Sequence, residues 1–181
     1  MKIGLVRHFE VIRGYPVGGW LTQDTFNQWM REYDESDVRI GAADLGGIAW
    51  DRCYSSDLPR ALKTAAVLHA GPIVTTDRLR EPAIRPFFTT SRVGLPFWTW
   101  TLMLRLAWLT SHPSQAEVKR AFLANVQGMA DELLSHADGN TLVVGHAGFM
   151  IFLRRELLRR GLTGPRFRLP ENGRLYVFER R

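Results

Sequence analysis

The chain has 181 residues, of which 45% are hydrophobic, and this length and composition are typical of one globular domain with a buried core. The formal net charge of +6 favours an anionic partner, namely nucleic acid, a membrane surface or a phosphorylated small molecule, although a basic surface that aids solubility explains it equally well. The one cysteine, Cys53, excludes an internal disulfide, and the N-terminus lacks the apolar core of a signal peptide, so we expect a cytoplasmic protein.

Apolar strand-like runs alternate with helix-like runs, and this alternation is typical of an α/β fold with a mostly parallel sheet. The expected strands, in chain order, cover about residues 1–6, 52–55, 73–75, 141–146 and 174–179. The last of these is expected at an edge of the sheet. No repeat, low-complexity tract or linker divides the chain, so we expect a single domain over residues 1–181.

Helices are expected between these strands. A glycine-rich loop leads to a first helix that begins near Leu21. The segment from Ser55 to Asp57 is a candidate N-cap for the next helix, because Pro59 then falls in the first turn, where proline is tolerated. Gly71-Pro72 ends that helix.

A later segment, residues 114–117, has the spacing of a capping box and predicts the start of a long helix. The expected buried face of this helix consists of Val118, Phe122, Val126, Met129 and Leu133. A further helix is expected from about Gly148 to Arg160. The arginines near its end suit the helix dipole, and no nucleic-acid recognition motif accompanies them, so nucleic acid is not expected as a partner.

Residues 82–113 form an insertion between these elements. They carry an aromatic cluster that consists of Phe87, Phe88, Phe97, Trp98, Trp100 and Trp108. The part at about 99–109 is expected to be helical. The most apolar stretch, residues 93–110, contains Pro96 and Arg105 and is too short to span a bilayer comfortably. Three interpretations of the aromatic cluster stay open: a substrate lid, a satellite core, or the contact of a homodimer.

Polar residues stand where the expected strands end. Arg7 and His8 follow the first strand, Arg60 lies in the helix after the second, and His146 ends the fourth. Because the carboxyl ends of parallel strands meet at one edge of a sheet, these side chains should lie together, beside one or two helix N-termini. Arginine side chains and helix N-termini both bind phosphate oxygens, so the pattern indicates phosphate chemistry.

A histidine in this setting can act as a nucleophile. It attacks phosphorus only when the attacking nitrogen is unprotonated, and nearby arginines disfavour the imidazolium; water can then hydrolyse the phosphohistidine. A leaving alkoxide needs a proton, and Glu81 follows the third strand at the same edge. Glu10 is the competing carboxylate, but it is so close to His8 in the chain that a structural hydrogen bond is the preferred interpretation.

Four blocks of sequence occur in order: Leu5 to His8, Tyr54 to Ala65, Leu79 to Glu81, and Val143 to Gly148. Together they resemble the histidine phosphatase superfamily, the phosphoglycerate-mutase-like family with an Arg-His-Gly motif. The resemblance implies a three-layer α/β/α sandwich whose mostly parallel sheet has an antiparallel edge strand. It also implies that neither a metal nor an organic cofactor takes part.

The resemblance assigns a role to each matching residue. His8 would be the phosphorylated nucleophile. Arg7 and Arg60 would hold the phosphoryl group, with His146 as the other member of the phosphate pocket. Glu81 would be the proton donor.

The chain also departs from the family pattern. Phe9 stands where the family usually has glycine, which is unfavourable if the position needs a positive φ. This motivates a second hypothesis, a catalytically impaired phosphate-binding or scaffold protein. Arg13 lies near the place of a family asparagine and is a further candidate for phosphate contact, although a solvated loop arginine is the preferred interpretation. Substrate recognition would depend on residues 9–22 and 82–113, the two segments least like the family.

The resemblance implies a metal-independent phosphatase for phosphate monoesters of small molecules, a phosphoric monoester hydrolase of the histidine acid phosphatase type. The family's mutases are generally longer, and this chain ends two residues after Glu179, which favours hydrolysis over phosphoglycerate mutase-type transfer. Phosphohistidine-protein phosphatases are closer in size, but they typically lack the insertion and an acid at the position of Glu81. Both activities stay as alternatives.

Overall fold

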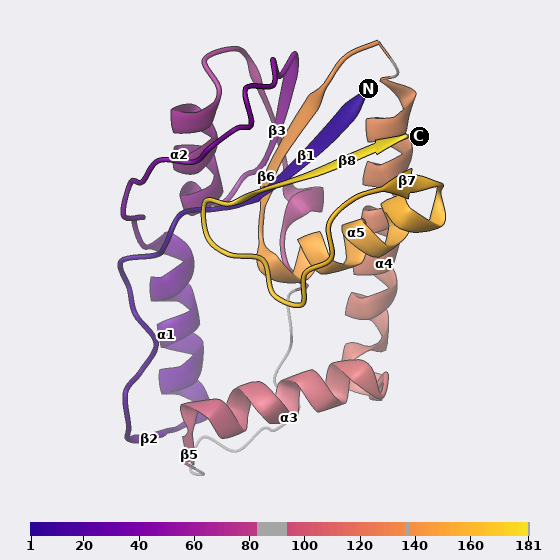
Figure 1. Cartoon of the computed structure of the whole chain (residues 1–181). Coiled ribbons are helices and arrows are strands. Elements are labelled where there is room, and N and C mark those ends of the chain that lie inside the picture. Colours follow the sequence, from indigo (N-terminus) through magenta and orange to yellow (C-terminus); the bar gives the residue numbers. More distant parts are fainter. Residues whose placement is uncertain (83–93, 137, 181) are drawn as a thin grey trace.

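The computed structural model describes residues 1–82, 94–136 and 138–180. Its main sheet has six strands in the order β4-β3-β6-β1-β8-β7. In chain order these are β1 (Lys2–Arg7), β3 (Arg52–Ser56), β4 (Ile73–Thr76), β6 (Thr141–Gly145), β7 (Leu162–Thr163) and β8 (Leu175–Arg180). Strands β4, β3, β6 and β1 are parallel, whereas β8 is antiparallel to β1 and β7 is antiparallel to β8 (Figure 1). The predicted mostly parallel sheet with antiparallel strands at one edge is confirmed.

The sequence analysis expects the last strand at the edge of the sheet. In the structure this strand, β8, is not the edge. The two-residue strand β7 pairs outside it, with Leu162 opposite Arg180 and Thr163 opposite Glu179. Two residues are too few to show an alternating pattern, so this strand leaves no periodic signal in the sequence.

The helices are α1 (Gln23–Glu35), α2 (Pro59–Leu68), α3 (Phe97–Leu109), α4 (Pro113–Ser135) and α5 (Ala147–Arg159), with a short 3-10 turn η1 (Asp77–Leu79) after β4. Two very short strands, β2 (Trp20–Leu21) and β5 (Leu95–Pro96), form a separate antiparallel pair.

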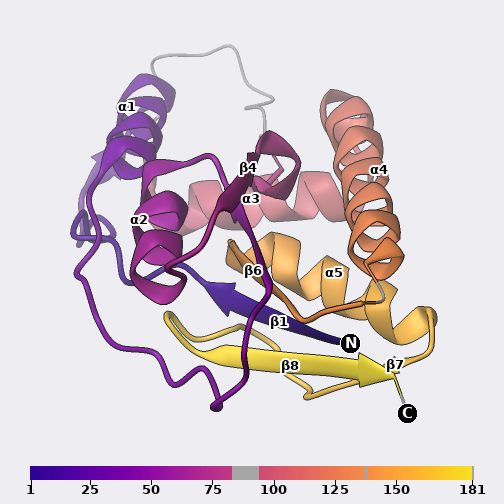
Figure 2. The ribbon, with the colours of Figure 1, turned by 90° about the horizontal axis from the view of Figure 1, so that it is seen from above.

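Alternate side chains of the strands face two different layers of helices. On β1, Ile3 and Leu5 belong to the core that includes Met129 of α4, whereas Val6 belongs to the core that includes Ala61 of α2. Figure 2 shows the result from above, with α2 on one side of the strands and α4 and α5 on the other. The period of two along the strands thus produces the three-layer α/β/α arrangement.

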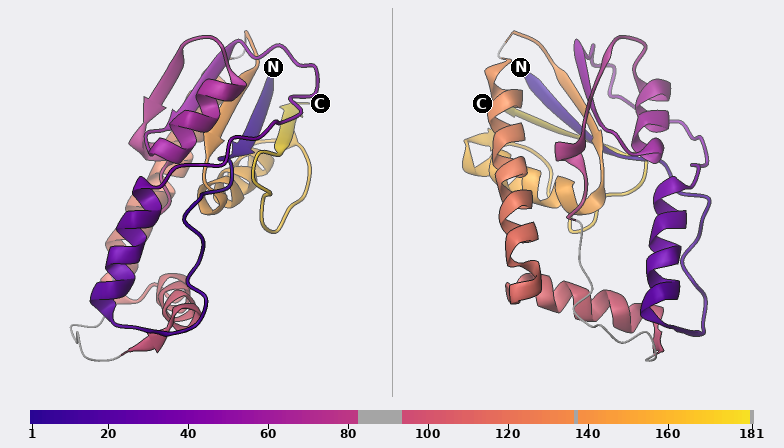
Figure 3. Two further views of the ribbon diagram at one scale, coloured as in Figure 1. Left: turned by 90° about the vertical axis from the view of Figure 1, so that its left-hand side faces the viewer. Right: turned by 180° about the vertical axis from the view of Figure 1, so that it is seen from behind.

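Helix α3 connects two parts of the molecule. At its first turn Phe97 packs against Trp29 of α1, and near its end Trp108 packs against Phe122 of α4. Figure 1 and the right-hand view of Figure 3 show α3 crossing from the end of α1 far from the sheet to the beginning of α4. Within the described segments, no helix has the length and apolar character that a membrane crossing requires.

The aromatic side chains of the insertion do not share one environment. Three of them are buried, namely Phe97, Trp100 and Trp108. Phe97 and Trp100 belong to a satellite core shared with Phe26 and Trp29 of α1, whereas Trp108 belongs to the core that includes Met129 of α4. Trp98 is 61% exposed, and Phe87 and Phe88 lie outside the described residues.

Two predicted helix caps are wrong. Helix α2 has Leu58 as its N-cap, without a side-chain hydrogen bond; the Ser56 hydroxyl lies 2.9 Å from Nε2 of His146 and accepts from the amide of Leu58. Helix α4 begins one residue before the expected capping box, at Pro113, and the ring of His112 accepts the hydrogen bond from the Ser114 amide. A proline at the first helical position suits this start because that amide lacks an intrahelical partner in any case.

The single cysteine, Cys53, is a small buried residue of β3. Burial raises the pKa of its thiol to about 12, so a reactive thiolate is disfavoured.

Gly4 of β1 makes room for the indole of Trp50. A methyl group at this position would lie 2.5 Å from Cη2 of Trp50 and 2.9 Å from Cδ1 of Leu175. We expect Gly4→Ala to lower the free energy of unfolding by about 1–3 kcal/mol, because the layer over β1 must shift. Gly14→Ala is the matched control, since nothing lies within 4 Å of an added methyl there. Urea unfolding of both variants checks this, and equal stabilities would contradict the packing argument.

Candidate active site

His8 lies directly after β1 and is 3% exposed. Its backbone amide donates to the carbonyl of Gly145 at 3.0 Å, which ties the end of β1 to the end of β6. Its Nδ1 lies 2.6 Å from the carbonyl of Phe9. A carbonyl only accepts, so Nδ1 carries the proton and the lone pair of the neutral ring is on Nε2. This is the tautomer that a nucleophilic Nε2 requires.

The charge state of His8 also suits a nucleophile. Burial lowers its pKa to about 3, and the positive charges of Arg60 and Arg7 act in the same direction, while the hydrogen bond to Phe9 opposes them. The imidazole is therefore neutral at any ordinary pH.

His146 is the N-cap residue of α5, and its ring centroid lies 5.2 Å from that of His8. Arg60 donates from Nε to its Nδ1 at 3.3 Å, and its Nε2 lies 2.9 Å from the hydroxyl of Ser56. A guanidinium only donates, so Nδ1 is the acceptor and Nε2 carries the proton. Burial is the main cause that holds the pKa of His146 well below its usual range, and the positive charge of Arg60 is the second cause. Both ring nitrogens thus have partners within the protein, and the ring orients Arg60.

Arg60 comes from the first turn of α2 and is 3% exposed. Its NH1 forms an ion pair with the carboxylate of Asp34 at 2.9 Å, and its guanidinium lies 5.3 Å from the ring centroid of Tyr33. A buried charge requires such partners. The sequence analysis missed both residues, because an acidic and an aromatic residue at the end of an amphipathic helix carry no distinctive signal.

Arg7 donates from NH1 to the carbonyl of Pro170 at 3.1 Å. Its Nε is buried and has no hydrogen-bond partner among residues 1–82, 94–136 and 138–180. The segment before β8 also holds the adjoining backbone, since Asn172 donates to the carbonyl of His8 at 2.7 Å and Gly173 donates to the carbonyl of Arg7 at 2.9 Å. Asn172 is a second residue that the sequence analysis missed. A fixed guanidinium with a spare buried donor suits an anionic ligand.

Glu81 lies at the edge of the sheet where the sequence places it. Its Oε1 accepts a hydrogen bond from the amide of Gly148 at 2.8 Å, at the N-terminus of α5. The preceding Arg80 forms a two-point ion pair with Asp57, which fixes this segment to the beginning of α2. The helix end expected to be free for an anion therefore already holds a carboxylate, and the amide that binds this carboxylate belongs to Gly148, two residues after His146.

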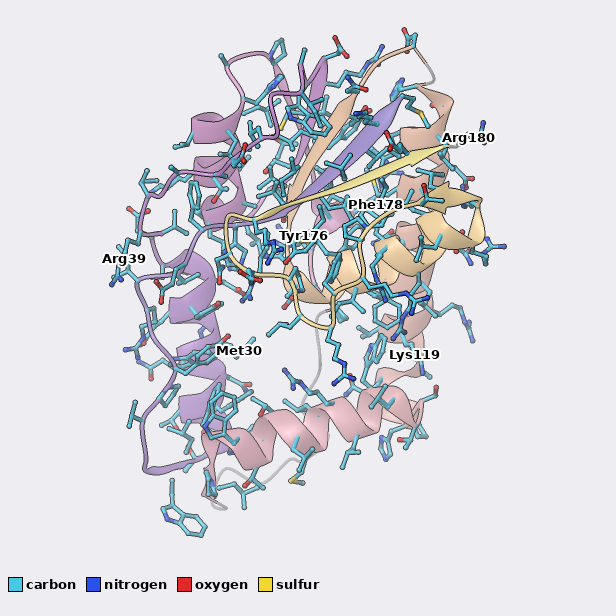
Figure 4. All side chains as sticks on the ribbon, viewed as in Figure 1. Met30, Arg39, Lys119, Tyr176, Phe178 and Arg180 are labelled. Atoms are coloured by element: carbon cyan, nitrogen blue, oxygen red, sulfur yellow. The ribbon has the colours of Figure 1, made fainter. Side chains whose placement is uncertain are left out.

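The two weaker candidates lie apart from this cluster. Glu10 forms an exposed ion pair with Arg39 and makes no hydrogen bond to His8, so the predicted structural bond is wrong. Figure 4 shows Arg39 at the outer edge of the molecule. Arg13 is also exposed and pairs with Glu32 at 2.7 Å, as the interpretation of a solvated loop arginine requires.

Phe9 causes no backbone strain, because its position does not need the positive φ that would make phenylalanine unfavourable. Among the described residues other than glycine, only Ser111 has a positive φ. The ring of Phe9 packs with Val11 and Val38, and a methyl group on Gly173 would lie 2.9 Å from that ring. The amide of Phe9 donates to Thr64 at 2.9 Å. The local structure is thus built to accept a large side chain after the histidine.

The cluster as a whole combines two guanidinium groups, two neutral imidazoles and two carboxylates, those of Asp34 and Glu81. Within the described residues, no three His, Cys, Asp or Glu side chains gather as ligands of one metal ion would. The guanidinium groups suit the oxygens of a phosphoryl group, and Nε2 of His8 offers a lone pair for attack on phosphorus.

Comparison with known families gives a match to the sequence model of the histidine phosphatase superfamily, branch 1, over residues 34–181. The matched range includes Arg60, Glu81 and His146, whereas Arg7 and His8 precede it. The structure supplies the missing part, because β1 places both residues beside β6. No curated protein sequence matches the chain.

Solved structures with the same fold include several phosphatases. The α-ribazole phosphatase of Shigella flexneri has a TM-score of 0.56 and 18% identity, covering 98% of this chain and 89% of that chain. A mycobacterial glucosyl-3-phosphoglycerate phosphatase in complex with VO3 has a TM-score of 0.54 and 19% identity, covering 96% and 98%. A phosphoserine phosphatase variant of Entamoeba histolytica, in complex with phosphoserine, has a TM-score of 0.54 and 18% identity, covering 87% and 80%. At these identities the comparisons show a shared phosphoglycerate-mutase-like fold.

The lowered pKa of His8 predicts a specific loss of stability in acid. The unfolded chain binds a proton near pH 6.5, whereas folded His8 stays neutral down to about pH 3, so the free energy of unfolding falls as the pH decreases through this range. Between pH 7.5 and pH 5 this one group accounts for about 2 kcal/mol. We expect His8→Asn to show a correspondingly smaller difference between the two pH values in urea unfolding. An unchanged difference would show that His8 is not held neutral by the fold.

Proposed function

Because the chain belongs to the histidine phosphatase superfamily, branch 1, we propose that it hydrolyses phosphate monoesters of small molecules through a phosphohistidine formed on His8. The observation that carries the proposal is the state of His8, which is buried, neutral and has the lone pair on Nε2, beside two fixed guanidinium groups. A structural histidine has no need of this combination.

In the first step, Nε2 of His8 attacks phosphorus and the bond from phosphorus to the ester oxygen breaks. Arg7 and Arg60 balance the charge that spreads over the phosphoryl oxygens. The phosphate displaces Asp34 as the main partner of Arg60, while His146 keeps the guanidinium oriented. Glu81 gives its proton to the leaving oxygen, so an alcohol departs rather than an alkoxide.

In the second step, water attacks the phosphorus of the phosphohistidine. The Glu81 carboxylate takes a proton from the water, the bond from phosphorus to Nε2 breaks, and inorganic phosphate is released. The imidazole returns to its neutral state with the proton still on Nδ1, because the carbonyl of Phe9 holds it there. Each cycle therefore consumes one ester and one water molecule and needs no further reactant.

Two observations favour ester hydrolysis over the alternatives. The names of the similar solved structures describe phosphatases, which supports hydrolysis over phosphoglycerate mutase-type transfer. The carboxyl of Glu81 at the site favours esters, whose alkoxide leaving group needs a proton, over phosphohistidine proteins. The hypothesis of an impaired scaffold loses its motive, since Phe9 is accommodated without strain.

The proposal predicts turnover without added metal. The protein should hydrolyse p-nitrophenyl phosphate in excess EDTA, and His8→Asn should reduce the rate to the uncatalysed background. Arg13→Gln is the control, because Arg13 pairs with Glu32 away from the cluster, and it should retain the rate of the unmodified protein. Absence of turnover over a broad panel of phosphate esters, with phosphate still bound, would instead support the scaffold hypothesis.

Glu81→Gln should separate substrates by their leaving group. For alkyl phosphates, whose alkoxides depend on the proton, we expect kcat/KM, which reports the first step and not the hydrolysis of the phosphohistidine, to fall by about 10²–10⁴-fold. For p-nitrophenyl phosphate, whose phenolate leaves without a proton, the loss should stay within roughly 10-fold. Glu10→Gln, the same change at an exposed carboxylate, is the control and should affect neither substrate. Equal losses on both substrates would rule out a role of Glu81 in protonating the leaving group.

A further inference from the structure

The two segments that depart from the family pattern lie against each other. The ring of Tyr15, from residues 9–22, lies 5.8 Å from the ring of Phe97 and 5.6 Å from that of Trp98, both from the insertion. The short strands β2 and β5 pair these segments again, with Trp20 opposite Pro96. The parts of the chain with no counterpart in the motifs thus form one joint surface.

This surface leads directly to the phosphate pocket. The ring of Tyr15 stacks on that of Tyr33, with 6.0 Å between the centroids. The guanidinium of Arg60 lies 5.3 Å from the ring centroid of Tyr33. Burial and the neighbouring Tyr15 raise the pKa of Tyr33 to about 12. The positive charges of Arg60 and Arg7 lower this pKa, so the Tyr33 hydroxyl interacts electrostatically with both arginines. The rings therefore form a continuous path from the buried guanidinium to α3.

The outer rings of the path are accessible but held in place. Tyr15 is 50% exposed and Trp98 is 61% exposed. Behind them, Trp29 meets Phe97 edge to face at 4.7 Å and donates from its indole nitrogen to the carbonyl of Gly14. An exposed aromatic face with a fixed orientation is a typical element of a small-molecule site.

We propose that Tyr33, Tyr15 and Trp98, the aromatic strip, form the subsite for the leaving group of a phosphate monoester that carries a planar ring. The inference rests on the proposed function, because the phosphoryl group must be held by Arg7 and Arg60 for the ester to extend along the strip. Successive groups on the path are 5–6 Å apart, about the spacing at which one aromatic ring packs against another. A first ring of the substrate lies on Tyr33 and Tyr15, and a larger ring system extends to Trp98.

The test compares phenyl phosphate with hexafluoroisopropyl phosphate. Their leaving alcohols are of similar acidity, so the two esters differ mainly in the planar ring. Tyr15→Leu should raise KM for phenyl phosphate by about 5–10-fold, the value of one ring contact, with kcat unchanged and with KM for the alkyl ester within about twofold. Tyr15→Phe should restore the low KM, since it keeps the ring and removes only the hydroxyl.

Leu109→Ala is the matched control, because Leu109 is an exposed apolar residue on the same helix but at its far end. It should leave both KM values unchanged. If Tyr15→Leu changes both esters equally, or lowers kcat alone, the rings only stabilise the fold and the proposal is overturned.

A binding measurement separates this proposal from the phosphatase activity. Benzylphosphonate and butylphosphonate carry the same charged group and cannot be hydrolysed. Calorimetry should show tighter binding of benzylphosphonate, and Tyr15→Leu should abolish the difference. If neither ester is turned over, the proposed function fails, but tighter binding of benzylphosphonate still supports the subsite. Equal binding of the two phosphonates overturns the subsite, whether or not the protein is a phosphatase.

Discussion

The buried positive charge of Arg60 is the interaction on which the site depends. A guanidinium with 3% exposure is stable only with close partners, and its partners come from separate elements: Asp34 and Tyr33 from α1, and His146 from the start of α5. The charge therefore determines how α1 and α5 lie relative to α2. Burial is the main cause that keeps both histidines neutral, and the charge of Arg60 acts in the same direction, because a second positive charge in the same buried volume would be repelled.

Neutral histidines alone do not make a nucleophile, and the backbone supplies the remaining constraint. The carbonyl of Phe9 holds the proton of His8 on Nδ1, and the carbonyl of Gly145 and the amide of Asn172 hold the backbone on either side of the ring. The segment before β8 is thus part of the site, although its residues do not resemble a catalytic motif. The large side chain of Phe9 is compatible with this geometry because Gly173 leaves room for its ring.

The sequence predicts the sheet and the candidate cluster well, because both follow from regular patterns. Strand alternation places Arg7, His8 and His146 at one edge, and Pro59 correctly marks the beginning of the helix that carries Arg60. What it does not predict are contacts between distant elements. The ion pair of Asp34 with Arg60 and the hydrogen bond from Asn172 to His8 join residues far apart in the chain, and they leave no local signal. Of the two wrong helix caps, that of α2 involves such a distant contact, since Ser56 bonds to His146, whereas that of α4 is local, since His112 caps the amide of Ser114.

Helix α1 separates the chemistry from the recognition of the substrate. Its last turn, with Tyr33 and Asp34, contacts Arg60, whereas its earlier residue Trp29 packs on Phe97 of the insertion. The reacting groups lie on the sheet edge and on the helices that follow its strands, so the insertion can differ between relatives without moving His8 or Arg7. The same helix also joins the insertion to the guanidinium, because Trp29 contacts Phe97 whereas the consecutive residues Tyr33 and Asp34 contact Arg60. The aromatic strip therefore adjoins the phosphate pocket, and a leaving group bound on it would help to orient the phosphoryl group for attack.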